Sequence, residues 1–71
     1  MSFSYTIEIE LEDDGRWIAE IPELPGVMVY GQTQAEAVSR VEALALRVIA
    51  DRIEEAGNCS AAMTVSFAAA A

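Results

Sequence analysis

Histidine is absent from this 71-residue chain, and cysteine occurs once. Without histidine, no side chain titrates between about pH 5 and 8 at its ordinary pKa, so general acid–base catalysis would need carboxylates with strongly raised pKa values. A lone Cys59 forms neither an intrachain disulfide nor a zinc-ligand set. We therefore expect no catalytic residue, no metal site and no cofactor, and we interpret Cys59 as an ordinary small residue rather than a reactive thiol.

Positive charge is also scarce. The chain has 4 basic residues, all arginine, against 12 acidic residues, and its net charge is −8. Proteins that bind a phosphate backbone do so with a basic face, so we expect no direct binding to nucleic acid and a basic protein as the partner. No apolar run approaches 18 residues and no export signal is visible, which predicts a cytoplasmic protein without a membrane segment.

The length allows one domain, residues 1–71, with a small hydrophobic core. Within it, apolar and polar residues alternate over residues 5–12, which predicts a strand with one wet face. An Asp-Asp-Gly turn at residues 13–15 leads to a second predicted strand over residues 16–21. A turn with two prolines, residues 22–26, precedes a third predicted strand over residues 27–32.

Thr33 and Glu36 have the spacing of a capping box, in which each side chain accepts the other's backbone N–H. The spacing predicts a helix that runs to about Ala56, with Gly57 in the left-handed position after its end. Apolar residues cover roughly 200° of this helix, about twice the usual stripe, so we expect part of that sector to face a second subunit. The candidates for this homo-oligomer interface are Leu46, Ile49 and Ile53, with the sheet residues Ile18, Met28 and Tyr30 as the alternative surface.

Alternation returns over residues 63–67 after a predicted loop at residues 58–62, and residues 68–71 are expected to be a frayed, disordered tail. The predicted order is β-β-β-α-β. It indicates an α+β domain of two layers, with a mostly antiparallel sheet and one long helix on a single face.

Four short motifs follow one another along the chain: the Tyr-x-Ile strand, Asp-Asp-Gly before Arg16-Trp17-Ile18-Ala19, Ile-Pro-Glu-Leu-Pro-Gly at residues 21–26, and Gly-Gln-Thr-Gln-Ala-Glu-Ala at residues 31–37. Together they resemble the motifs of the HicB antitoxin family. The resemblance covers about residues 5–57. It implies a partial ribonuclease H-like fold and an antitoxin that binds HicA, a small basic ribonuclease with a catalytic histidine. The sequence resembles a stand-alone version without the family's C-terminal DNA-binding domain, so operator binding is not implied.

Two kinds of residue are candidates for partner binding. Ile18 and Tyr30, together with Met28, are apolar residues on the predicted wet face of the sheet and would form a docking patch ringed by Glu8, Glu10 and Glu20. Four carboxylates would supply the charge for a basic partner: Asp13, Asp14, Glu20 and Glu23. Trp17 is in phase with Ala19 and Ile21, which favours a core position over an interface anchor. The turn at residues 22–26 is either a corner of the chain or a toxin contact, and we favour the corner.

Two other functions stay open. Glu8, Glu10, Glu12 and Glu20 can lie on one sheet face, as a vestigial ribonuclease H-like nuclease would require, although simple strand alternation also accounts for them. A small-ligand regulatory module is the other alternative, and it would have a pocket between sheet and helix.

Overall fold

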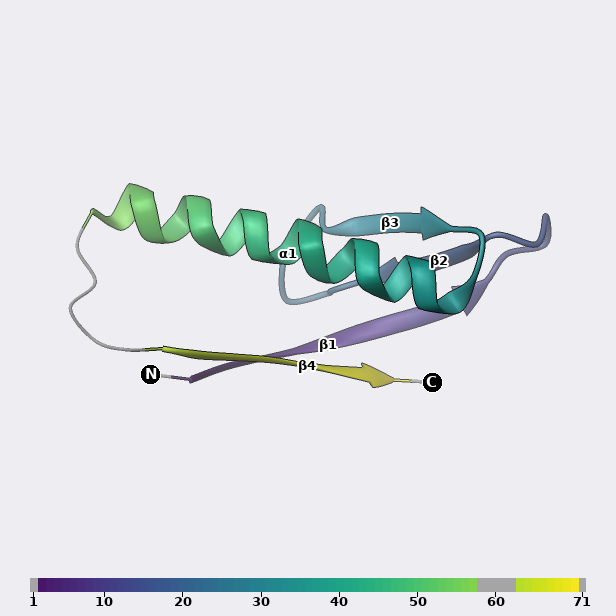
Figure 1. Ribbon diagram of the computed structural model, residues 1–71, viewed down its shortest axis with the longest axis horizontal. Coiled ribbons are helices and arrows are strands. Elements are labelled where there is room, and N and C mark those ends of the chain that lie inside the picture. The colour runs from purple at the N-terminus through teal and green to yellow at the C-terminus, as the bar shows by residue number, and fades with distance from the viewer. Residues whose placement is uncertain (1, 58–62, 71) are drawn as a thin grey trace.

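The computed structural model describes residues 2–57 and 63–70. It has an α+β fold in which one helix packs on a four-stranded sheet (Figure 1). The elements in chain order are β1 (Ser2–Leu11), β2 (Trp17–Glu20), β3 (Met28–Gly31), α1 (Gln34–Ala56) and β4 (Thr64–Ala70). The β-β-β-α-β order and the two-layer architecture predicted from periodicity are thus confirmed.

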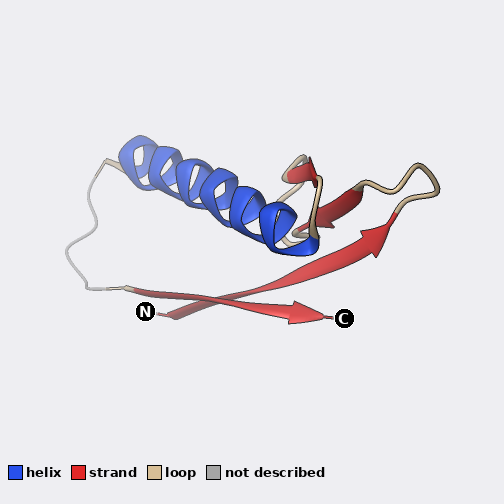
Figure 2. Ribbon diagram, turned by 45° about the vertical axis from the view of Figure 1, so that its right-hand side comes forward, coloured by secondary structure: helices blue, strands red, loops and turns tan. Residues whose placement is uncertain are grey.

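The sheet has the strand order β3-β2-β1-β4 and is mixed. β1 pairs antiparallel with β2, and β2 with β3, because short turns connect them. β4 returns after α1 and pairs parallel with β1, as a strand reached by a helical crossover does. Figure 2 shows α1 on one side of the sheet, leaving the opposite face without a second layer.

β4 is longer than its sequence pattern indicated. It continues to Ala70, and its last three residues pair with Thr6, Ile7 and Glu8 of β1. The expectation of a tail is therefore wrong for residues 68–70, because backbone hydrogen bonds to the long first strand hold an alanine run that has little strand propensity of its own. Residue 71 and the predicted loop at residues 58–62, which includes Cys59, lie outside the described residues.

Both ends of α1 carry caps. The Thr33 hydroxyl accepts the Glu36 backbone N–H at 3.1 Å, as predicted. The Glu36 carboxylate, however, accepts the N–H of Gln32 at 2.9 Å rather than that of Thr33, so the reciprocal half of the box is displaced by one residue. At the other end Gly57 has φ +83°, and its N–H donates to Glu54 and Ile53 carbonyls at 3.1 and 3.3 Å.

The core lies between α1 and the middle of the sheet. Ala37, Val41, Ala45 and Ile49 form the buried stripe of the helix, at intervals of four residues. From the sheet and its turns come Ile7, Ala19, Ile21, Leu24 and Val27. Trp17 is half-buried and packs against this cluster, which confirms its predicted core position.

The proline turn is a corner fixed to the core. Ile21, Leu24 and Val27 are all buried, at intervals of three residues, while Pro22 and Pro25 are exposed. The Leu24 N–H donates to the Ile21 carbonyl at 3.0 Å, and the Val27 N–H donates to the Leu24 carbonyl at 3.1 Å. These bonds reverse the chain from β2 into β3, which is the role that we favoured for this segment.

The predicted oligomer residues lie in three different environments. Leu46 is 49% exposed and Ile53 is half-buried, but Ile49 is 8% exposed and belongs to the core of the chain itself. Ile49 was therefore a wrong candidate, since a side chain already buried within the protomer cannot add contact area to a second subunit.

As to membranes, the one helix in the described part of the chain lacks an apolar stretch long enough to cross a bilayer.

Candidate protein-interaction site

The candidate site is the sheet face opposite α1. Strand register arranges its side chains in two rows. Glu10, Ile18 and Tyr30 lie side by side on β1, β2 and β3, and Glu8, Glu20 and Met28 form the parallel row. We call these six residues the outer patch.

The apolar half of the outer patch is open to solvent. Met28 is 46% exposed and Tyr30 is 37% exposed, while Ile18 is half-buried between its two neighbouring strands. A shallow hollow of about 260 Å³ lies beside Ile18 and is bounded by Glu8, Ile9, Glu10 and Glu20. The predicted patch of three apolar residues bordered by acidic residues is therefore present, and its shape offers one recess surrounded by carboxylates.

The three glutamates of the outer patch take part in no ion pair among the described residues. Within residues 2–57 and 63–70, the two ion pairs are Arg16–Asp14 and Arg40–Glu36, and neither involves Glu8, Glu10 or Glu20. Glu8 is directly opposite Glu20 across the β1–β2 pair. Like charges in that position lower sheet stability by a few tenths of a kcal/mol. A cation supplied from outside would convert this local repulsion into attraction.

Arg16 brings a positive charge to one border of the outer patch. Its guanidinium carbon lies 4.3 Å from the centroid of the Tyr30 ring, a cation–π contact. Its Nε donates to Asp14 Oδ2 at 2.7 Å, and its backbone N–H donates to Asp14 Oδ1 at 3.0 Å. These bonds, the backbone bond foremost, hold the pKa of Asp14 below its ordinary value. Asp14 is thus already paired within the chain.

A second arginine, Arg40, hydrogen-bonds to the backbone at the free edge of β3. Arg40 Nη1 donates to the Tyr30 carbonyl oxygen at 3.1 Å, and Arg40 Nη2 lies 3.5 Å from Glu36. This carbonyl points away from β2, toward the unpaired side of the edge strand. A side-chain donor there occupies a backbone group that would otherwise accept a bond from another strand.

The four predicted acidic contacts do not form one cluster. Asp13 and Asp14 precede β2 and Glu23 follows it, so the two groups are separated by the length of that strand, roughly 13 Å. Glu23 is also engaged in the fold, because its two carboxylate oxygens accept the Thr6 backbone N–H at 3.1 and 3.3 Å. This bond gives the Thr6 backbone N–H of β1 a partner at a position beyond the end of the neighbouring strand β2. Of the four, Glu20 alone belongs to the outer patch, so the predicted grouping was wrong.

Sequence reasoning missed Arg16 as a member of the site. The sequence nevertheless contained an indication of this position. Arg16 is two residues before Ile18, so its side chain lies on the same sheet face, and it is the diagonal neighbour of Tyr30 across the β2–β3 pair. Glu12, which alternation placed with the other carboxylates, follows the end of β1 and lies in the turn.

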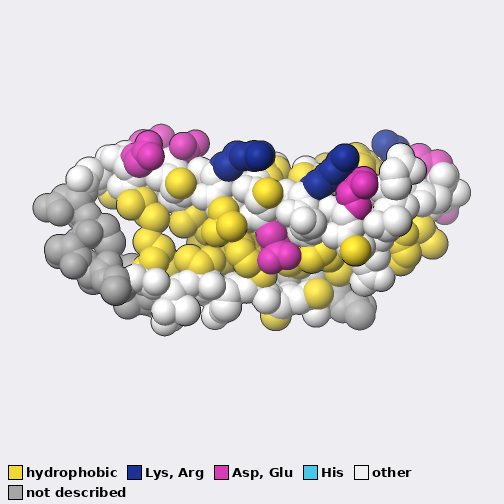
Figure 3. All heavy atoms as spheres, in the orientation of Figure 1, with side chains coloured by type: hydrophobic (Ala, Val, Ile, Leu, Met, Phe, Trp, Pro, Cys, Tyr) yellow, Lys and Arg dark blue, Asp and Glu magenta, His cyan; other side chains and the backbone are white. Residues whose placement is uncertain are grey.

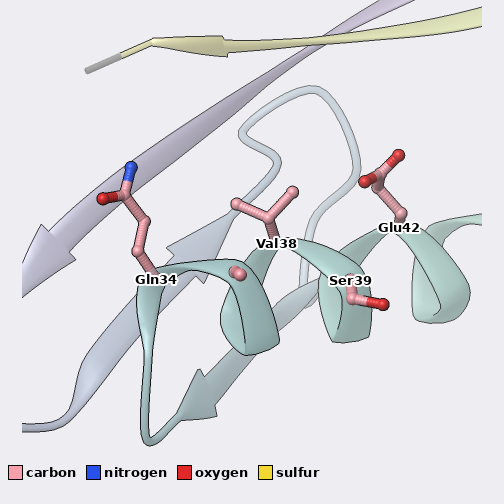
Figure 4. Close-up of a pocket in the computed structure, with 5 residues that line it drawn as sticks. Gln34, Val38, Ser39 and Glu42 are labelled. Carbon is pink, nitrogen blue, oxygen red and sulfur yellow. The ribbon is translucent and has the colours of Figure 1, made fainter.

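A separate open hollow of about 510 Å³ lies along the first half of α1. Figure 4 shows Val38 and Glu42 projecting from one side of the helix and Ser39 from the adjacent side. Its lining residues all come from α1, namely Gln34, Ala35, Val38, Ser39 and Glu42. It is open to solvent and no residue of the sheet lines it, so it is not the enclosed pocket between sheet and helix that a small-ligand module would have.

No group of three or more metal-ligating side chains converges within the part of the chain that the structure describes. We expect the purified protein to leave RNA intact in the presence of Mg²⁺ or Mn²⁺, because two-metal cleavage needs carboxylates that hold two ions about 4 Å apart. Gel analysis of a labelled RNA checks this expectation. Metal-dependent cleavage that disappears in Glu8→Gln or Glu10→Gln would contradict it.

Comparisons of this chain with protein-family models, with curated proteins and with solved structures find no match. Its function must therefore be argued from the geometry and charge of its own residues.

Proposed function

We propose that this chain is a non-enzymatic interaction domain that binds and inhibits a small basic protein through the outer patch. The observation that carries the proposal is the Glu8–Glu20 pair: two carboxylates face each other beside Ile18 without any counter-ion in the described chain. Such a pair is unfavourable in the free domain and gains most from a lysine or arginine of a partner.

The sequence motifs name a class for that partner. Their resemblance to HicB antitoxins supports a HicA-type toxin, a small basic ribonuclease, as the bound protein. A net charge of −8 would steer a basic ribonuclease toward this chain. Carboxylates of the outer patch would then occupy positions where RNA phosphates bind, so inhibition would be competitive with RNA.

The apolar residues supply a different part of the interaction. Ile18 and Tyr30 are direct neighbours across β2 and β3, and Met28 extends the surface along β3. Desolvated aromatic anchors govern how long a complex lasts, whereas exposed charges at its border govern how fast it forms. We therefore expect Tyr30 to affect mainly the dissociation rate of the complex and the three glutamates to affect mainly its association rate.

Binding kinetics against a purified HicA-type basic ribonuclease test the proposal. The double variant Glu8→Gln/Glu20→Gln is expected to lower the association rate roughly tenfold at low salt and much less at high salt, because salt screens exposed charges. Tyr30→Ala is expected to raise the dissociation rate by about tenfold or more.

The matched control is Glu54→Gln/Glu55→Gln, which removes the same charge from the exposed C-terminal end of α1. It should lower the association rate less than the outer-patch variant does. Equal effects of the two double variants would show that net charge alone matters and would refute this binding surface. Absence of binding would refute the antitoxin proposal itself.

A further inference from the structure

α1 leaves part of its own side of the sheet uncovered. The helix packs over β3 and β2, contacts β1 less, and makes at most a marginal contact with β4. Figure 3 shows hydrophobic side chains gathered between α1 and the strands below it, where the surface is hollowed. We call four half-buried residues of β1 and β4 on this side the uncovered face: Phe3, Tyr5, Val65 and Phe67.

The uncovered face is ordered by strand pairing. Phe3 is the register partner of Val65, and Tyr5 is the partner of Phe67. The Tyr5 and Phe67 rings stack with their centroids 5.8 Å apart. These side chains therefore form a continuous, half-exposed apolar surface at the border of the core, against which Tyr5, Val65 and Phe67 also pack, rather than scattered exposed residues.

β4 is also a free edge of the sheet. It has seven residues, none of them charged and none proline, so it lacks the usual features that prevent an edge strand from pairing. No side chain in the described ranges hydrogen-bonds to the β4 backbone, whereas Arg40 does so at the opposite edge, on β3. Among the described residues the two edges of the sheet thus differ, since β3 has a side-chain donor on its edge backbone and β4 has none.

The net charge of the chain indicates which partner would bind at the β4 edge and the uncovered face. Two chains of net charge −8 repel each other wherever acidic residues meet, so self-association needs a neutral contact surface. β4 is uncharged throughout, and its outer-face neighbours on β1 are Ser2, Ser4 and Thr6, with Glu8 beside Ala70 at the end of the strand. Apart from that carboxylate, a basic partner would find no complementary charge along this edge. A second copy of the chain, which brings the same neutral edge and apolar residues, fits this surface best.

We propose that two copies of the chain join antiparallel through their β4 edges about a two-fold axis. The contact is isologous, since each copy contributes the same strand. It merges the two four-stranded sheets into one and places both helices on the same side. With the axis at Ser66, Val65 of each copy lies opposite Phe67 of the other, a favourable pair of a β-branched and an aromatic residue. This interface borders the outer patch only at Glu8, the register partner of Ala70, and its contact residues are different, so its test does not depend on the proposed function.

Ser66 and Ser4 provide a matched pair of variants. Their hydroxyl oxygens are 3.2 Å apart, both side chains are exposed on the outer face, and they are register partners on β4 and β1. Ser66→Glu and Ser4→Glu break the same hydroxyl contact and add the same charge. Only Ser66→Glu, however, places the two new carboxylates opposite each other across the proposed axis.

Sedimentation velocity over a concentration series is the test. The wild-type chain is expected to approach twice 7.6 kDa as concentration rises. Ser66→Glu should raise the dimer dissociation constant roughly tenfold, and Ser4→Glu at most about threefold. Far-ultraviolet circular dichroism should show both variants folded.

Hydrogen exchange of the wild-type chain gives a second readout that requires no variant. Backbone amides of β4 should exchange more slowly at high concentration than at low concentration, while those of β3 stay unchanged. A chain that remains monomeric at high micromolar concentration, equal weakening by the two serine variants, or β4 amides indifferent to concentration would each overturn the proposal. So would a dimer that Ile18→Glu disrupts and Ser66→Glu does not.

Discussion

Leu24→Ala is expected to lower the free energy of unfolding by about 2–5 kcal/mol, the range for buried leucines replaced by alanine. Leu24 is 2% exposed although it lies in a turn between two prolines. Its side chain fills the core where β2 ends, and its backbone bonds to Ile21 and Val27 form the corner. The substitution removes apolar contacts and leaves a cavity. A 71-residue domain has about 4–11 kcal/mol of total stability, so this loss is a large fraction of it.

Urea denaturation followed by circular dichroism measures this effect. The matched control is Leu46→Ala, because Leu46 is 49% exposed and alanine is a good helix former. The control should change the unfolding free energy by less than about 1 kcal/mol. If both variants lost the same free energy, the turn would not be fixed to the core as described.

Gly31→Ala is expected to destabilise the domain by about 1–3 kcal/mol, and by more if α1 cannot shift. A Cβ at this position would lie 2.6 Å from the Ala37 nitrogen and 3.0 Å from its Cα. Both atoms belong to the helix backbone, so no rotamer change relieves the clash. The end of β3 would have to move away from the first turn of α1, which also carries the Thr33 cap.

Gly15→Ala is the control that distinguishes destabilisation by a steric clash from destabilisation by an unfavourable backbone conformation. A Cβ at Gly15 meets no atom within 4 Å, but its φ of +89° is unfavourable for alanine by roughly 1–2 kcal/mol. Gly31 is not among the glycines with positive φ, so its requirement is space alone. Thermal unfolding of both variants is the measurement. A Gly31→Ala variant as stable as the wild type would mean that β3 and α1 are less closely packed than described.

Much of the fold was predictable because local patterns in the sequence agree with the tertiary structure. The alternation in β1, the Asp-Gly turn and the Thr33 cap each depend on residues within a few positions of one another. The helix accordingly begins and ends within a residue of its predicted bounds. The patch of Ile18, Met28 and Tyr30 was predictable for the same reason, since parity along β2 and β3 decides which face a side chain occupies.

Long-range contacts were less accessible to sequence reasoning. Residues 68–70 are alanines without alternation, and they are strand residues because β1 is long enough to pair with them. Glu23 has the composition of a surface residue, yet it serves the Thr6 backbone, which is 17 residues away. Ile49 could not be assigned to core or interface from a wide apolar sector alone. Each of these outcomes depends on which distant segment is adjacent, and periodicity does not encode that information.

The parallel pairing of β1 with β4 also sets an order for assembly. Ser4 and Ser66, adjacent in the sheet, are 62 residues apart in sequence, whereas β1 and β2 are joined by a tight hairpin. The hairpin and its packing against α1 therefore form at low loop-closure cost, and β4 joins afterwards. On the ribosome, the half of β1 before Glu8 must wait for β4 to be synthesised before it acquires this strand neighbour. In the newly made chain, the most distant pairing in the sheet is thus the last to close.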